Sequence, residues 1–310
     1  MRDTTLGDRI HGLSTERQAL LSTLLKTTRS GPSPSPATSP APPQPAAPAG
    51  DAKALCQQLY DALSHQLNSG EYGEFSYFLN YGYISDGSPE YAAVELPEHY
   101  IDRNSVKLAL ELIGDSPIST RRVLDVGCGR GGLVHVLSQF FTPAEVTGID
   151  LSPIAIEFCQ RAHRRGNVRF EVGDAEALPF PDNAFDVVTN LESSSCYPDW
   201  HAFYAAVYRV LAPGGDFLYS DCLPRQRVAD AIAVLTGLGF ELERDRDITS
   251  NVLASCAENA RRRLMAYGNA AIGSDMENFL AAPGSRYYEE MRQGLWTYRI
   301  LKLRKPAAGV

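Results

Sequence analysis

Segments with the pattern of strands alternate with segments of helical length through the middle of the chain, and this alternation limits the possible folds more than any other feature. Five strands are predicted near residues 121–127, 145–150, 167–172, 185–190 and 215–221, with helices near 132–140, 153–165 and 200–211. Strands joined by helices of this length form a parallel sheet covered on both faces. Further helices are predicted near 52–69, 104–113, 225–237 and 250–268, and further strands near 240–246 and 295–303. We therefore expect a Rossmann-like α/β sheet of seven strands, mostly parallel, with the last strand antiparallel.

The first predicted strand runs into a glycine-rich turn. Asp125 stands near the end of the strand, and Gly127, Gly129 and Gly132 follow with the spacing G-x-G-x-x-G. Glycine lets a backbone adopt positive φ and approach a ligand closely. This spacing is typical of dinucleotide sites, so taken alone it leaves an NAD-dependent enzyme open.

Acidic residues at three successive strand ends favour a different cofactor. Asp125 would repel the pyrophosphate that such a turn wraps in a dinucleotide site, but it would attract the cationic methionine group of S-adenosylmethionine (SAM). Asp150 ends the second strand, where a ribose-binding acid is expected, and Asp174 follows the third strand, where it could bond the adenine amino group. The sequence therefore predicts a SAM site. The residues expected to contact the cofactor are Asp125, Gly127, Cys128, Gly129, Asp150, Leu151, Asp174, Ala175 and Asn190.

The segment after the fourth strand carries the best candidate for acid–base chemistry. Glu192 follows that strand at the middle of the sheet, opposite the glycine turn. Methyl transfer to an alcohol needs the oxygen, methyl and sulfur held in line and a general base for the hydroxyl proton. We expect Glu192 to be that base, and the alternative is a helix-capping or hydrogen-bonding role.

Several segments resemble the O-methyltransferase domains embedded in modular polyketide synthases, which are class I SAM-dependent methyltransferases. They are FLNYGY at 78–83, ELPEHY at 95–100, NSVKL at 104–108, HAFY at 201–204, VYRVLAPGG at 207–215 and DRDIT at 245–249. The resemblance covers roughly residues 55 to 305. It implies methylation of a β-hydroxyl, or of an enolised β-keto oxygen, on an acyl chain bound to an acyl carrier protein.

One position departs from the family pattern. The family resembles Glu-Ser-Ser-His-x-Tyr-Pro after the fourth strand, where histidine and glutamate act together as the base, and this chain has Ser195 at the histidine position. Glu192, Tyr197 and Pro198 match. A serine hydroxyl cannot collect a proton near neutral pH, so catalysis would rest on Glu192 beside Ser195. The alternative is a catalytically impaired or inactive domain that still binds SAM or a carrier protein. None of the histidines of the chain is placed as a convincing replacement; they are His11, His65, His99, His135, His163 and His201.

The chain divides into three parts. Residues 1–30 contain a short amphipathic segment that could dock on other synthase modules, with a leader or disordered tail as the alternative. Residues 31–50 are rich in Pro, Ala and Ser and form a linker. Residues 51–310 would be the methyltransferase domain, with a helical lid at 51–118, and with 75–83 and 222–285 around the substrate.

Charge and cysteine usage narrow the partners and the compartment. A net charge of −8 argues against nucleic-acid binding. The six cysteines lack paired spacing, which favours reduced thiols, no metal and a cytoplasmic protein. We find no secretory signal pattern and no apolar run of membrane-spanning length. Two basic runs, at 161–165 and 261–263, are either solvated helix faces or a docking patch for an acidic protein.

Overall fold

The computed structural model describes residues 49–69, 73–87, 94–97, 100, 102–266 and 274–307. The predicted docking segment at 1–30 lies outside the described residues, as does the predicted linker except for its last two positions.

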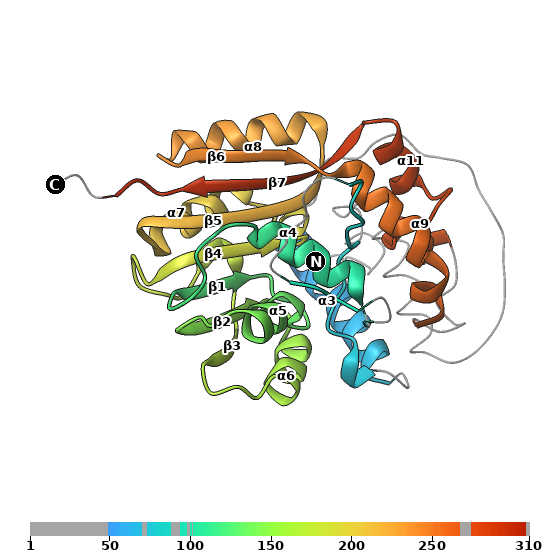
Figure 1. Cartoon of the computed structure of the whole chain (residues 1–310), viewed down its shortest axis with the longest axis horizontal. Coiled ribbons are helices and arrows are strands. Elements are labelled where there is room, and N and C mark those ends of the chain that lie inside the picture. The colour runs from blue at the N-terminus through green and yellow to red at the C-terminus, as the bar shows by residue number, and fades with distance from the viewer. Residues whose placement is uncertain are drawn as a thin grey trace, which may run out of the picture.

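The predicted seven-stranded sheet is confirmed. Its strands are β1 (Arg122–Val126), β2 (Glu145–Asp150), β3 (Val168–Val172), β4 (Phe185–Leu191), β5 (Leu211–Pro224), β6 (Glu241–Asp247) and β7 (Trp296–Arg304). They lie side by side in the order β3-β2-β1-β4-β5-β7-β6, and β7 is antiparallel to both of its neighbours (Figure 1). The chain reverses its direction of winding between β1 and β4, the place where open α/β sheets bind ligands beyond the strand ends.

Helices cover both faces of the sheet. They are α3 (Ala49–Asn68), α4 (Arg103–Ile113), α5 (Gly132–Phe140), α6 (Pro153–Ala162), α7 (Trp200–Val210), α8 (Arg225–Gly237), α9 (Thr249–Ala266), α10 (Ser274–Phe279) and α11 (Arg286–Arg292). One hydrophobic cluster joins α4, α5, α6 and α9 to one face, and a second joins α7 and α8 to the other. β1 and β4 are almost wholly buried because they are covered on both sides, which explains their continuous apolar sequences.

Three element bounds differ from the prediction for local reasons. α3 begins at Ala49, so the last two linker residues are helical. α6 ends at Ala162 and not at 165, because His163 leaves the helix and its ring packs between Tyr77 and Phe170. β5 continues to Pro224 because the antiparallel β7 pairs with it up to Trp296.

The helices at the carboxyl edge of the sheet form a separate layer. In Figure 1, α3, α9 and α11 all lie at the edge where the parallel strands end. Leu59 and Leu63 of α3 pack against Met276 and Leu280 of the α10 region in a small apolar cluster. α4, which the sequence placed in the lid, packs instead on the face of the sheet beside α5. Of the lid predicted at 51–118, α3 and the segment at 77–81 lie at the carboxyl edge of the sheet.

Among its described residues the chain has no helix of the length and apolarity needed to cross a bilayer.

A half-buried pair of histidines, His135 and His163, should make folding stability depend on pH. Burial, with His163 and Arg165 nearby, lowers the pKa of His135 to about 4, while the unfolded side chain titrates near ~6.5. The stability is therefore complete above ~6.5 and is lost progressively as the pH falls towards about 4. His135→Phe keeps an aromatic ring against Tyr77. Measured by urea unfolding, its free energy of unfolding should fall less between about pH 7.5 and about pH 5 than that of the parent.

His65→Gln, which changes an exposed histidine on α3, serves as the control and should follow the parent. Identical slopes for the parent and His135→Phe would contradict the assignment.

Candidate active site

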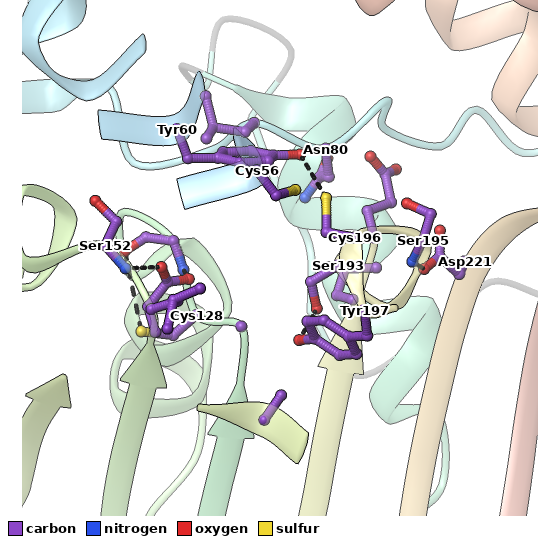
Figure 2. A pocket seen from close by; sticks show the side chains of 18 of the residues that line it. Cys56, Tyr60, Asn80, Cys128, Ser152, Ser193, Ser195, Cys196, Tyr197 and Asp221 are labelled. Carbon is purple, nitrogen blue, oxygen red and sulfur yellow. Dashed lines mark hydrogen bonds between the residues drawn. The ribbon is translucent and has the colours of Figure 1, made fainter. Parts of the chain in front are cut away.

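A cavity of about 340 Å³ opens where the parallel strands end. Its walls come from segments that are distant in sequence: the glycine turn after β1, the loop after β4, the end of β5, the helix α3 and the segment at 77–81. Figure 2 shows the strand ends pointing into this space, with Cys128 and Ser152 on one side and Ser195, Cys196 and Asp221 on the other. Tyr60 and Cys56 of α3 cover it.

The glycine turn is bent so that its backbone faces the cavity. Gly127 has a φ of 70°, and its amide donates to the carbonyl oxygen of Ile149 on β2 at 2.8 Å. A Cβ at Gly127 would collide with Ser193 and Tyr197. Gly129 has a φ of 52°, and the nearest atom to a Cβ built there is Leu79 Cδ1 at 4.0 Å. The space above Gly129 is therefore open to a ligand.

Asp150 ties the turn to the next helix. One carboxylate oxygen accepts from the amide of Gly129 and the other from the amide of Ser152, both at 2.8 Å. Burial raises the pKa of Asp150, and these backbone hydrogen bonds oppose the rise. The carboxylate lines the cavity beside Leu151, as expected for a ribose-binding acid.

Asp125 is a buried acid beside Asp150. It is 2% exposed, and Thr189 Oγ1 donates to it at 2.8 Å. Burial, with a contribution from the charge of Asp150, raises the pKa of Asp125 to about 7. A cationic group in the cavity would reverse this effect, because an opposite charge favours the ionised acid.

Asp174 is engaged with the lid, a contact that the sequence did not indicate. Lys53 Nζ on α3 donates to Asp174 at 2.6 Å and also contacts Glu176, and Asp174 accepts the Glu176 amide at 2.9 Å. Lys53 and Asp174 are far apart along the chain, so no repeating pattern in the sequence could indicate their ion pair. Asp174 and its neighbour Ala175 nevertheless line the cavity, where the adenine was expected.

Asn190 lies behind the cavity and not in it. It is fully buried, and its amide donates to the Val126 carbonyl at 2.9 Å and to Ser193 Oγ at 2.7 Å. These bonds join the ends of β1 and β4. Asn190 thus supports the loop after β4, and its direct contact with the cofactor stays a prediction. Cys128, by contrast, does line the cavity.

Arg130 is a structural residue that the sequence did not single out. It is 1% exposed and donates to the carbonyl oxygens of Ser76 at 2.6 Å and Gly73 at 2.8 Å, and to Asn68 Oδ1 at 2.8 Å. Its guanidinium also lies 3.6 Å from the centroid of the Phe158 ring. The charge is committed to holding the glycine turn against the chain that follows α3.

Glu192 enters the cavity from a strained backbone position. Its φ is 53°, in the left-handed region that non-glycine residues rarely adopt. Its carboxylate accepts from the backbone amide of Tyr81 at 2.8 Å and from the hydroxyl of Tyr298 at 2.6 Å. The helix-capping alternative is not supported, because the residue at the cap of the following short helix is Ser193.

Ser195 stands at the cavity wall, next to a second carboxylate. It is exposed, and its amide donates to Asp221 Oδ2 at 3.1 Å. Asp221 is 3% exposed and also accepts from Ser194 Oγ at 2.6 Å and from the Cys222 amide at 2.7 Å. None of the four described histidines lines the cavity; they are His65, His135, His163 and His201. No cluster of possible metal ligands is found among the described residues.

Known proteins agree with this geometry. Residues 123–215 match the family model described as a methyltransferase domain. The chain is 36% identical over 232 residues to a fatty-acid O-methyltransferase of Mycolicibacterium smegmatis, covering 74% of this chain and 84% of the relative. It is 31% identical over 253 residues to a phthiotriol/phenolphthiotriol dimycocerosates methyltransferase of Mycobacterium leprae, covering 79% and 90%. The crystal structure of the [4+2]-cyclase SpnF has a similar fold, with a TM-score of 0.64 at 23% identity, covering 83% of this chain and 97% of that one.

The fold and site define a class I SAM-dependent methyltransferase, and the chain belongs to that family. It is a SAM-dependent O-methyltransferase. The cavity fits the cofactor on its own evidence: open space lies above Gly129, Asp150 is placed for a ribose, and Asp125 is a buried acid whose ionisation a cation would favour. Resemblance to the polyketide synthase domains is thereby confirmed only at the level of the methyltransferase class.

Removing Asp150 should abolish tight SAM binding. Asp150→Ala loses the acceptor for Gly129 and Ser152 together with the predicted ribose contact. Hydrogen bonds to charged groups contribute ~1.5–3 kcal/mol each, so the Kd for SAM should rise by about 100-fold or more. Isothermal titration calorimetry measures this change. Glu192→Gln is the control and should bind SAM like the parent, whereas an unchanged Kd in Asp150→Ala would disprove the role.

Affinity for SAM should rise with pH around neutrality. Because the pKa of Asp125 is about 7 without a ligand, acidification protonates the acid that a cationic ligand needs ionised. SAM affinity should fall as the pH drops through about 7, by up to about tenfold per unit, and Asp125→Asn should remove this component. The amino group of SAM titrates in both proteins, so the difference between their slopes reports Asp125. Parallel slopes would contradict the prediction.

Proposed function

We propose that this enzyme methylates an uncharged hydroxyl, either a β-hydroxyl or an enolised β-keto oxygen, of a polyketide acyl chain bound to an acyl carrier protein. The observation that carries the proposal is the Glu192 carboxylate, which is fixed in the cavity at the end of β4 by Tyr81 and Tyr298.

Glu192 would act as the general base. SAM, when bound, supplies an electrophilic methyl group. The residues around it orient the acceptor, and Glu192 takes the proton of the hydroxyl as the oxygen–methyl bond forms. General bases contribute ~10²- to 10⁴-fold in rate.

The charges of the cavity favour a neutral acceptor over a carboxylate. Among the described residues that line it, the cationic side chains are Lys53 and Arg130, and both are committed to protein partners. Glu192 after β4 and Asp221 in β5 would repel the carboxylate of an acidic acceptor. A fatty acid, which the name of one relative suggests as an acceptor, would be ionised already and would need no base.

An acyl chain suits the remaining wall. Aromatic residues from six segments line the cavity; they are Tyr60, Tyr77, Phe78, Tyr81, Tyr197, Phe279, Tyr287 and Trp296. The relatives named for fatty acids and dimycocerosates also speak for long apolar acceptors. The carrier protein, the docking of 1–30 on other synthase modules and a cytoplasmic location complete the proposal, and they rest on the sequence patterns.

The decisive assay compares a carrier-bound hydroxyacyl chain with a free fatty acid. A 3-hydroxydecanoyl acyl carrier protein and free decanoic acid are each incubated with the enzyme and SAM, and intact mass is measured. We expect a gain of one methylene on the hydroxyacyl carrier protein and none on the acid, because only the hydroxyl needs Glu192 and carries no charge. The same hydroxyacyl chain as an N-acetylcysteamine thioester is the control for the carrier.

Each other outcome overturns a stated part. Methylation of decanoic acid alone would disprove the neutral acceptor. Equal rates on the thioester and the carrier protein would disprove carrier recognition. Transfer by Ser195→His but not by the parent would show that the missing imidazole is essential and that Glu192 alone does not suffice.

A further inference from the structure

We propose that Tyr298 is the positioning residue for Glu192: its hydroxyl, presented from β7, holds the carboxylate in the cavity and favours its ionised form in the absence of the histidine replaced by Ser195. The inference rests on the proposed role of Glu192 as base. It assigns a function to a strand that lies beyond β5 and carries none of the sequence motifs.

The position of Tyr298 is fixed by its backbone. Its amide donates to Thr249 Oγ1 at 2.8 Å, and its carbonyl oxygen accepts from the Ile248 amide at 2.9 Å. In the ladder it stands opposite Cys222 of β5, and its side chain is fully buried. The hydroxyl reaches the Glu192 carboxylate at 2.6 Å, a length typical of a strong charge-assisted hydrogen bond.

The conformation of Glu192 depends on this contact. The amide of Glu192 donates to the Ser220 carbonyl at 2.8 Å. Its carboxylate accepts from the Tyr81 amide and from the Tyr298 hydroxyl. The left-handed region is unfavourable for a non-glycine residue, so the surrounding contacts must offset this strain. The strain and the two donors together aim the carboxylate into the cavity.

The surroundings keep Tyr298 a donor. Burial, together with the charge and hydrogen bond of Glu192, raises the pKa of the Tyr298 hydroxyl well above its usual value. Other titratable groups face Tyr298, or face Tyr81, the second donor to Glu192. They are Tyr81 itself, Asp221, Cys222, Cys256 and Tyr287. The pKa values of Tyr81 and Cys222 are also raised, so both stay neutral near pH 7. Protonation of the carboxylate would replace this charge-assisted hydrogen bond with a weaker neutral one.

The test removes one oxygen atom. Tyr298→Phe keeps the buried ring and loses only the donor to Glu192. Tyr83→Phe is the matched control: Tyr83 is also a buried tyrosine (1% exposed), but it lies outside the cavity wall and bonds Arg246. The proteins are labelled with ¹³C at the glutamate carboxyl carbons, and the resonance that disappears in Glu192→Gln is assigned to Glu192 and followed from about pH 4 to about pH 9.

In Tyr298→Phe we expect the titration of that resonance to move to higher pH by about one unit. With the hydroxyacyl carrier protein, kcat should fall about tenfold at low pH and recover as the pH rises, at unchanged SAM affinity. Tyr83→Phe should titrate and turn over like the parent. Titration midpoints that coincide in Tyr298→Phe and the parent would overturn the positioning role.

Failure of the base assignment would look different. If Glu192→Gln retains the kcat of the parent, the proposed function of Glu192 is wrong whatever the titration shows. If Glu192→Gln is inactive and Tyr298→Phe matches the parent in both readouts, only the role of Tyr298 is wrong.

Discussion

The structure is organised around two buried carboxylates that lie side by side at the carboxyl edge of the sheet. Asp125 and Asp150 end neighbouring strands, and in the described part of the chain their partners are hydroxyl and amide donors, not cations. Burying an acid without a counter-charge is costly, so the acid either takes up a proton or finds a cationic ligand. The raised pKa of Asp125 is the first of these responses, and binding of SAM supplies the second. The glycine turn, the loop after β4 and the lid all face this edge.

The two ends of the cavity solve opposite problems. At the cofactor end, the carboxylates of Asp125 and Asp150 favour a positively charged ligand. At the acceptor end, Glu192 receives a hydroxyl and an amide donor, which favour the charged form of an acid without neutralising it as an arginine would. A base must be ionised to take a proton and yet still have affinity for one, and hydrogen bonds from neutral groups meet both needs. The buried guanidinium of Arg130 instead donates to backbone carbonyl oxygens of the chain after α3 and stabilises it.

How much the sequence could predict follows from the range of each interaction. The sheet was predictable because period and length are local, and Asp125, Asp150 and Glu192 were predictable because parallel strands bring successive strand ends to one edge. Lys53 and Tyr298 could not be found this way, since each meets its partner through elements more than a hundred residues apart. Asn190 shows the limit of this reasoning: its place near the end of β4 was predictable, but the burial of its side chain and its bond to Ser193 were not. The identity of a residue at a strand end is local information, and the direction of its side chain is not.

Side-chain directions matter because the fold alone does not determine function. A sheet of this kind fixes where a cofactor and an acceptor can meet, but it does not fix what happens there. In this chain position 195 is a serine whose backbone amide donates to Asp221. The Glu192 carboxylate has meanwhile kept two donors from other elements. These donors come from the core strand β7 and from the segment over the cavity, so elements distant in sequence together fix the Glu192 carboxylate. Catalysis at such a site depends less on a second titrating group than on whether the chain around Glu192 is held in place when the acceptor arrives.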